Sequence, residues 1–151
     1  MSEPHATKDY HLFFEHRPDY LYANVMADRI SFDIAKKYWI EILKLRYERG
    51  YNKVLIEKNV KESLSAHSVV ELVSQLANSG CSRNRFAIFD HNYDFIRSSL
   101  EQQAGTNRGL QLRIAPTMAE AIKWLGASTV PTQLEHDRVA ELEMWRRDLV
   151  R

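Results

Sequence analysis

Four short apolar runs, separated by amphipathic segments, constrain the fold of this chain more than any other feature. The runs cover residues 20–26, 54–56, 86–89 and 110–114. Such runs, bounded by turn residues, are typical of strands buried inside a sheet. The segments between them are long enough to form crossover helices, which would let the later strands run parallel through right-handed connections. The pattern predicts an α/β fold.

The start of the chain is expected to add an antiparallel strand. Residues 10–14 are aromatic and apolar, and the turn-forming residues 17–19 separate them from the run at 20–26. Pro18 pre-sets the backbone dihedral that a tight turn needs. We therefore predict a mixed sheet of about five strands that opens with a hairpin, continues with parallel strands and is covered by helices.

The first helix is predicted between Ser31 and Gly50. Ser31 can cap it by accepting a hydrogen bond from a first-turn amide, and Gly50 can end it in a left-handed conformation. Asp33 suits the positive end of the helix dipole. The apolar residues recur at the three- and four-residue spacing of a buried helix face; they are Ala35, Tyr38, Trp39, Ile42 and Leu45.

Two later helices are predicted from capping boxes, in which a Ser or Thr and a Glu three residues on satisfy each other's unpaired amides. Ser68 and Glu71 have this spacing and predict a helix that ends at Gly80. Thr117 and Glu120 have the same spacing and predict the last helix of the domain. The polar stretch before Ser68 is expected to be a loop.

The composition fits one domain. The 151 residues are 44% hydrophobic and 27% charged, which supports a core without disulfides. We expect residues 1–8 to form a flexible tail, residues 9–126 the domain, and residues 127–151 a linker and an amphipathic C-terminal helix at about 132–149. That helix must bury its apolar stripe, and a homodimer is the expected solution.

The charge balance and the missing motifs exclude several functions. Lys and Arg number 21 and Asp and Glu 20, a net charge of +1, so no overall field attracts nucleic acid. The chain has neither the glycine-rich phosphate loop nor the dinucleotide fingerprint. No apolar run reaches the roughly 18 residues of a membrane span, and the first residues do not resemble a secretory signal. We expect a cytoplasmic protein with no nucleic-acid partner and no integral membrane segment.

Cys81 is the one thiol that could act as a nucleophile. Arg83 and Arg85 follow it and would favour the thiolate. No histidine is tied to Cys81 by sequence, so we expect a semi-exposed loop thiol rather than a catalytic one.

A metal loop is weighed for residues 90–94, which contain carboxylates and a histidine. Their spacing does not match that of a known metal loop. We expect Asp90 or Asn92 instead to cap a helix that ends near Gly105. With no linked nucleophile, base and orienting group in the chain, we predict no enzyme activity, no metal and no cofactor.

A ligand or partner site is expected at the carboxyl ends of the parallel strands, where open α/β sheets bind their ligands. In this chain those ends lie near Lys58, Asn59, Asp90 and His91, next to a polar loop over residues 57–68. The site is predicted to hold a protein partner or a small ligand.

The loop end beside the second helix could also bind an anion. Ser63, Ser65 and His67 lie where unpaired amides and the helix dipole favour a phosphate. A phosphoserine there would be tolerated electrostatically. Capping is the alternative interpretation, and it explains Ser68 and most of the other serines.

Several segments resemble the SpoIIAA-like group of the STAS superfamily. They are residues 20–25, 53–57, 85–89, 107–113 and 120–125. The sharpest is the strand that begins N-R-G, followed by a helix with the pattern E-A-x-x-W-L. The resemblance covers about residues 10–126 and implies a STAS-like mixed sheet with covering helices.

STAS domains of the anti-anti-sigma type are switched by phosphorylation of a serine in a D-S-S-G stretch. In the corresponding place, the acidic residue falls on Leu64, the phosphorylated serine on Ala66 and the glycine on His67. The switch residue is thus missing, and the adjacent Ser65 is the candidate for modification. Other relatives resemble Sec14-type lipid carriers, which would imply an apolar pocket.

The resemblance implies a non-enzymatic regulatory or binding module. Its predicted ligand- or partner-binding residues are Lys58, Asn59, Ser65, His67, Asp90 and His91. The alternative function is a carrier of a small apolar ligand or lipid.

Overall fold

The computed structural model describes residues 9–81 and 83–126. The predicted tail at 1–8 and the predicted linker and helix at 127–151 lie outside the described residues. The strands are β1 (His11–His16), β2 (Leu21–Ala27), β3 (Lys53–Val60), β4 (Arg85–Asp90) and β5 (Gln111–Ala115). The helices are α1 (Phe32–Arg49), α2 (Ala66–Ala77), α3 (Phe95–Asn107) and α4 (Met118–Leu125).

The five strands form one mixed sheet in the order β1-β2-β3-β4-β5. β1 pairs antiparallel with β2, and β2 to β5 run parallel to one another. One row across the sheet joins Leu21, Val54, Phe86 and Leu112. The predicted fold class is confirmed, and the carboxyl ends of four strands meet at one edge.

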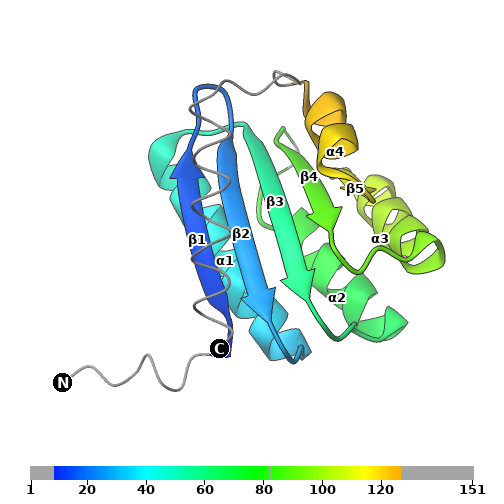
Figure 1. Ribbon diagram of the computed structural model, residues 1–151. Helices are drawn as coiled ribbons and strands as arrows, with labels where there is room; N and C mark the ends of the chain where they lie inside the picture. Colours follow the sequence, from blue (N-terminus) through cyan, green and yellow to red (C-terminus); the bar gives the residue numbers. More distant parts are fainter. Residues whose placement is uncertain (1–8, 82, 127–151) are drawn as a thin grey trace.

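The helices divide between the two faces of the sheet (Figure 1). The larger core packs α1, α2 and α3 on one face, which we call the α1–α3 face. α4 packs on β3, β4 and β5 from the other side, which we call the α4 face. None of the helices in the described ranges is long and apolar enough to cross a membrane.

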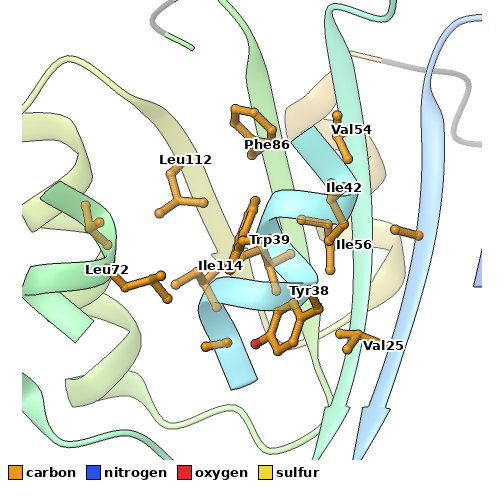
Figure 2. Close-up of a cluster of buried hydrophobic side chains, with 14 of the residues drawn as sticks. Val25, Tyr38, Trp39, Ile42, Val54, Ile56, Leu72, Phe86, Leu112 and Ile114 are labelled. Atoms are coloured by element: carbon orange, nitrogen blue, oxygen red, sulfur yellow. The ribbon is translucent and has the colours of Figure 1, made fainter. Parts of the chain in front are cut away.

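Strand alternation sorts the side chains between these faces. Val54 and Ile56 of β3 lie in the core of the α1–α3 face, whereas Leu55 between them packs with α4. Figure 2 shows how Tyr38 and Trp39 of α1 lie among the β-strand side chains of this core. Complete burial of each large apolar side chain contributes about 1.5–3 kcal/mol.

Two helix starts were predicted correctly. The Ser31 side chain accepts a hydrogen bond from the Ile34 amide, and Gly50 ends α1 at φ 74°. The Thr117 side chain accepts from the Glu120 amide at 3.2 Å and donates to the Glu120 carboxylate at 3.2 Å. Both signals are local in sequence, which is why they can be read without the fold.

The predicted start of α2 was wrong. Ser65, not Ser68, caps the helix, since its hydroxyl accepts from the Ser68 amide at 3.2 Å. The helix ends at Ala77 rather than Gly80. β3 also continues through Val60, so residues 57–60, predicted as loop, belong to the sheet. Glu57 and Lys58 have polar partners on neighbouring elements, which allows them to lie in a strand.

The predicted cap of α3 was wrong, whereas the helix ends at Asn107, near Gly105 as predicted. Asp94 caps the helix by accepting from the Arg97 amide at 3.0 Å, because Asp90 still belongs to β4. Gly105 lies inside the helix, which continues to Asn107. The helix backbone at Gly105 passes so close to β5 that a Cβ atom there would lie 3.4 Å from the Leu112 side chain.

Candidate functional site

The predicted site residues lie on two different faces of the sheet. Lys58 and Asp90 are register partners on β3 and β4 and point toward the α1–α3 face. Asn59 points toward the α4 face because side chains alternate along β3, and His91 contacts Glu57 on that same face. The two pairs share the carboxyl edge of the sheet but cannot share one pocket.

Ser65 and His67, the predicted site residues at the start of α2, belong to neither of these two pairs. Ser65 is exposed, and its hydroxyl is used to cap α2. His67 is exposed on the first turn of the same helix. The loop reaches the sheet edge instead through Glu62, Ser63 and Leu64, which line a pocket there.

That pocket lies on the α1–α3 face, where β3 and β4 end between α1, α2 and α3. Its empty volume is about 550 Å³, part of it open to solvent. Apolar core residues form part of the wall, and charged side chains of both signs form the rest. The residues with ionisable side chains are Tyr38, Lys58, Glu62, Asp90, Arg97 and Glu101.

Lys58 is the central cation of the pocket. Its Nζ atom lies 3.9 Å from Asp90 Oδ2, and the two side chains are only 22% and 12% exposed. The other oxygen of Asp90 accepts a hydrogen bond from the Asn92 amide at 2.8 Å. The ammonium group therefore sits largely out of water with one long ionic contact.

The neighbouring groups keep Lys58 charged. Burial alone would lower the pKa of Lys58, but the proximity of Tyr38, Glu101 and Asp90 outweighs it, so the pKa is raised. Burial also raises the pKa of Tyr38 and of Glu101. At neutral pH the pocket thus holds a firmly protonated ammonium and a neutral phenol.

Sequence reasoning missed three residues of this pocket. Tyr38 was assigned only to the core, and Arg97 and Glu101 were not singled out. The last two lie four residues apart on α3, and opposite charges at this spacing share one helix face. The sequence spacing could have shown that Arg97 and Glu101 share one helix face. Only the packing of α3 shows that this face is directed toward Lys58.

A second polar cluster lies on the α4 face. Glu57 is buried at the end of β3, where its Oε2 atom lies 2.7 Å from His91 Nε2. Its Oε1 atom accepts a hydrogen bond from the Tyr22 hydroxyl. Asn24 donates to the same hydroxyl at 3.0 Å. Sequence reasoning named His91 but missed its carboxylate partner, because Glu57 was assigned to a loop.

The environment of Cys81 differs from the prediction. The thiol is buried, with 2% of the residue exposed, and its Sγ atom lies 3.1 Å from the Ser79 hydroxyl. Apolar neighbours, including Leu76 and Phe86, surround it. The prediction of a semi-exposed thiol is wrong because Cys81 packs in the apolar core rather than facing solvent. Across the described ranges, no three His, Cys, Asp or Glu side chains are grouped to hold a metal.

No protein-family model matches the chain, and no curated protein matches it. The five-stranded mixed sheet agrees with the fold that the STAS resemblance implies. Membership of that superfamily is a proposal.

Proposed function

We propose that this protein is a STAS-like, non-enzymatic binding module of the regulatory type. Its ligand site is the pocket at the carboxyl ends of β3 and β4. The observation that carries the proposal is the largely buried Lys58 ammonium, whose ion pair with Asp90 is 3.9 Å long. A buried charge is costly unless it is closely paired, so a ligand oxygen beside Lys58 would be stabilised.

The charges of the pocket favour a small ligand that carries both signs. Lys58 and Arg97 can receive a carboxylate, and Asp90 and Glu101 can receive an ammonium group. A ligand with a single charge would be attracted by the groups of one sign and repelled by the groups of the other. The ligand class that matches these charges is a small zwitterion such as an amino acid.

Thermal unfolding of the full chain tests the proposal. Glycine, L-alanine, L-serine and L-glutamate are added singly, with propionate and ethylammonium as ligands of one charge. At least one amino acid should raise Tm with increasing concentration, because a ligand that binds only the native state stabilises it. Propionate and ethylammonium should raise Tm much less.

Two variants locate the effect. Lys58→Met should abolish the ligand-dependent rise in Tm, whereas Lys123→Met, which alters an exposed lysine on α4, should preserve it. If propionate raises Tm as much as an amino acid does, the pocket does not prefer a zwitterion. If the rise in Tm persists in Lys58→Met, the ligand does not bind in this pocket. If no amino acid raises Tm, both the ligand class and the binding site are wrong.

A carrier of an apolar ligand is the second candidate function. A smaller hollow between α1, α2, β4 and β5 has an empty volume of about 240 Å³. Part of that volume is open to solvent, so this hollow suits only a small apolar ligand. Native mass spectrometry of the purified protein should detect a bound apolar molecule if this candidate holds. The wall is entirely apolar: Trp39, Leu43, Leu76, Cys81, Phe86, Leu110 and Leu112.

The remaining expectations belong to the same proposal. They are a cytoplasmic location, a protein partner and a homodimer formed through the C-terminal helix. Light scattering of the full chain and of a chain ending at residue 126 tests the homodimer, since the deletion should reduce the mass from dimer to monomer. An unchanged mass contradicts it.

A further inference from the structure

We propose that His91 accepts a phosphoryl group on its Nδ1 atom. The donor would be another molecule that carries a P–N or acyl-phosphate bond. The support comes from the geometry of Glu57 and His91 on the α4 face, away from the pocket that contains Lys58. The inference does not depend on what that pocket binds.

The buried carboxylate fixes the tautomer of the histidine. A carboxylate can only accept hydrogen bonds, and Glu57 accepts from the Tyr22 hydroxyl on one oxygen. At 2.7 Å from its other oxygen, His91 Nε2 must therefore carry the proton. Neutral imidazole holds one N–H, so the lone pair lies on Nδ1.

The ring is held in place and remains reachable. The Phe89 ring packs against it with centroids 4.5 Å apart. The His91 side chain is 31% exposed, whereas Glu57 is 7% exposed. The nucleophilic atom and its orienting carboxylate thus have the arrangement of an activated nucleophile, with the third group, Tyr22, positioning the carboxylate.

Phosphoryl transfer is the chemistry that this arrangement suits best. His91 lies outside the two pockets described above, and its partly exposed ring can meet a group that a second molecule presents. A phosphoryl acceptor needs only an accessible nucleophile, because the donor molecule presents the group.

The transfer balances without any further reactant. The Nδ1 lone pair forms the new N–P bond while the bond from phosphorus to the donor's leaving atom breaks, and its electron pair stays with that leaving group. The ring keeps its Nε2 proton and becomes positively charged. Glu57 then stabilises this charge through a charge-assisted hydrogen bond.

Other histidines of the described chain lack this arrangement. His16 has its Nδ1 atom 3.2 Å from the Tyr51 hydroxyl, and His67 is exposed on α2. Among the histidines of the described residues, His91 alone has a ring nitrogen within hydrogen-bond distance of a carboxylate oxygen. His67 therefore provides a reference site within the same molecule.

Chemical phosphorylation of the full chain tests the proposal. The protein is incubated with phosphoramidate, which releases ammonia on transfer, and each histidine is then quantified by mass spectrometry at alkaline pH. His91 should be phosphorylated about tenfold faster than His67, since a hydrogen bond to a charged group is worth roughly one power of ten or more in rate. Phosphorus NMR should identify the Nδ1 isomer at His91.

The variant Glu57→Gln should reduce the His91 to His67 ratio to about one and lose the preference for Nδ1. Tyr22→Phe, which leaves the carboxylate in place, should reduce the ratio by a smaller factor. The folded state of each variant is verified by circular dichroism, because an unfolded chain would also give a ratio of about one. Equal rates at His91 and His67 in the unaltered protein, or an Nε2 product at His91, would overturn the proposal.

Discussion

The Nζ atom of Lys58 lies 3.9 Å from Asp90 Oδ2, across two neighbouring parallel strands. Hydrogen-bonded N–H···O pairs close to about 2.7–3.2 Å, so the two charges attract without forming a tight pair. Asp90 is meanwhile held through its other oxygen by the Asn92 amide. Lys58 thus retains hydrogen-bonding capacity toward the pocket, which is the basis of the proposed function.

The free energy of unfolding should fall at alkaline pH. Burial raises the pKa of Tyr38 above 10.0, and the acidic neighbours of Lys58 raise its pKa above 10.5 despite burial. In both cases the folded state holds its proton more tightly than the unfolded state. The stabilisation is therefore complete below the unfolded pKa values and is lost as the pH rises above about 10.

Urea unfolding between about pH 8 and pH 11 measures this loss. Tyr38→Phe removes one of the two groups and should make the decline shallower. Tyr47→Phe, at a residue that is 78% exposed, is the matched control and should leave it unchanged. A decline of the same steepness in Tyr38→Phe would refute the assignment to Tyr38.

The cap of α2 can be assigned by mutation. Ser65→Ala removes the hydroxyl that accepts from the Ser68 amide and should lower the free energy of unfolding by about 1 kcal/mol. Ser68→Ala should change it by less than about 0.5 kcal/mol. Chemical denaturation of both variants decides between the two serines, and a larger loss for Ser68→Ala would restore the original sequence prediction.

Two glycines near β5 should respond in opposite directions to the same substitution. Gly105→Ala should stabilise the protein by about 0.5–1 kcal/mol, because alanine favours a helix interior and its Cβ would only touch Leu112 at 3.4 Å. Gly109→Ala should destabilise it by about 1 kcal/mol, since φ is +87° there. Urea unfolding measures both, and stabilisation by Gly109→Ala would contradict the backbone assignment.

The native thiol should be unreactive. Cys81 is buried among apolar side chains, and a thiol without access or a nearby activating group reacts slowly. An aromatic disulfide reagent should label it at least about a hundredfold more slowly in the native protein than in urea. Rapid native labelling would indicate that the region around Cys81 opens readily.

The elements that sequence predicted well are those with local signals. The hairpin, the apolar runs and the caps at Ser31 and Thr117 depend on residues within a few positions of each other. β3 was predicted too short because the partners that allow Glu57 to lie in a strand, Tyr22 and His91, come from distant parts of the chain. Such partners are invisible until the strands are assembled.

The sequence predicted the candidate site as one cluster at the carboxyl edge of the sheet, whereas the structure divides its residues between two faces. Lys58 and Asn59 are neighbours in sequence, yet adjacent side chains of a strand point to opposite faces. That rule was available and would have divided the site. The contributions of α3 could not be foreseen in the same way, since the direction of its charged face depends on how the helix packs.

The most direct test of the central claim is to map where a zwitterion binds. Proton–nitrogen correlation spectra of the full chain are recorded during titration with an equimolar mixture of glycine, L-alanine, L-serine and L-glutamate. The account predicts saturable shifts for the amides of residues 58–64 and 90–92 and for Arg97 and Glu101, with α4 unaffected. Absence of saturable shifts at these residues, or saturable shifts confined to α4 and β5, would contradict it.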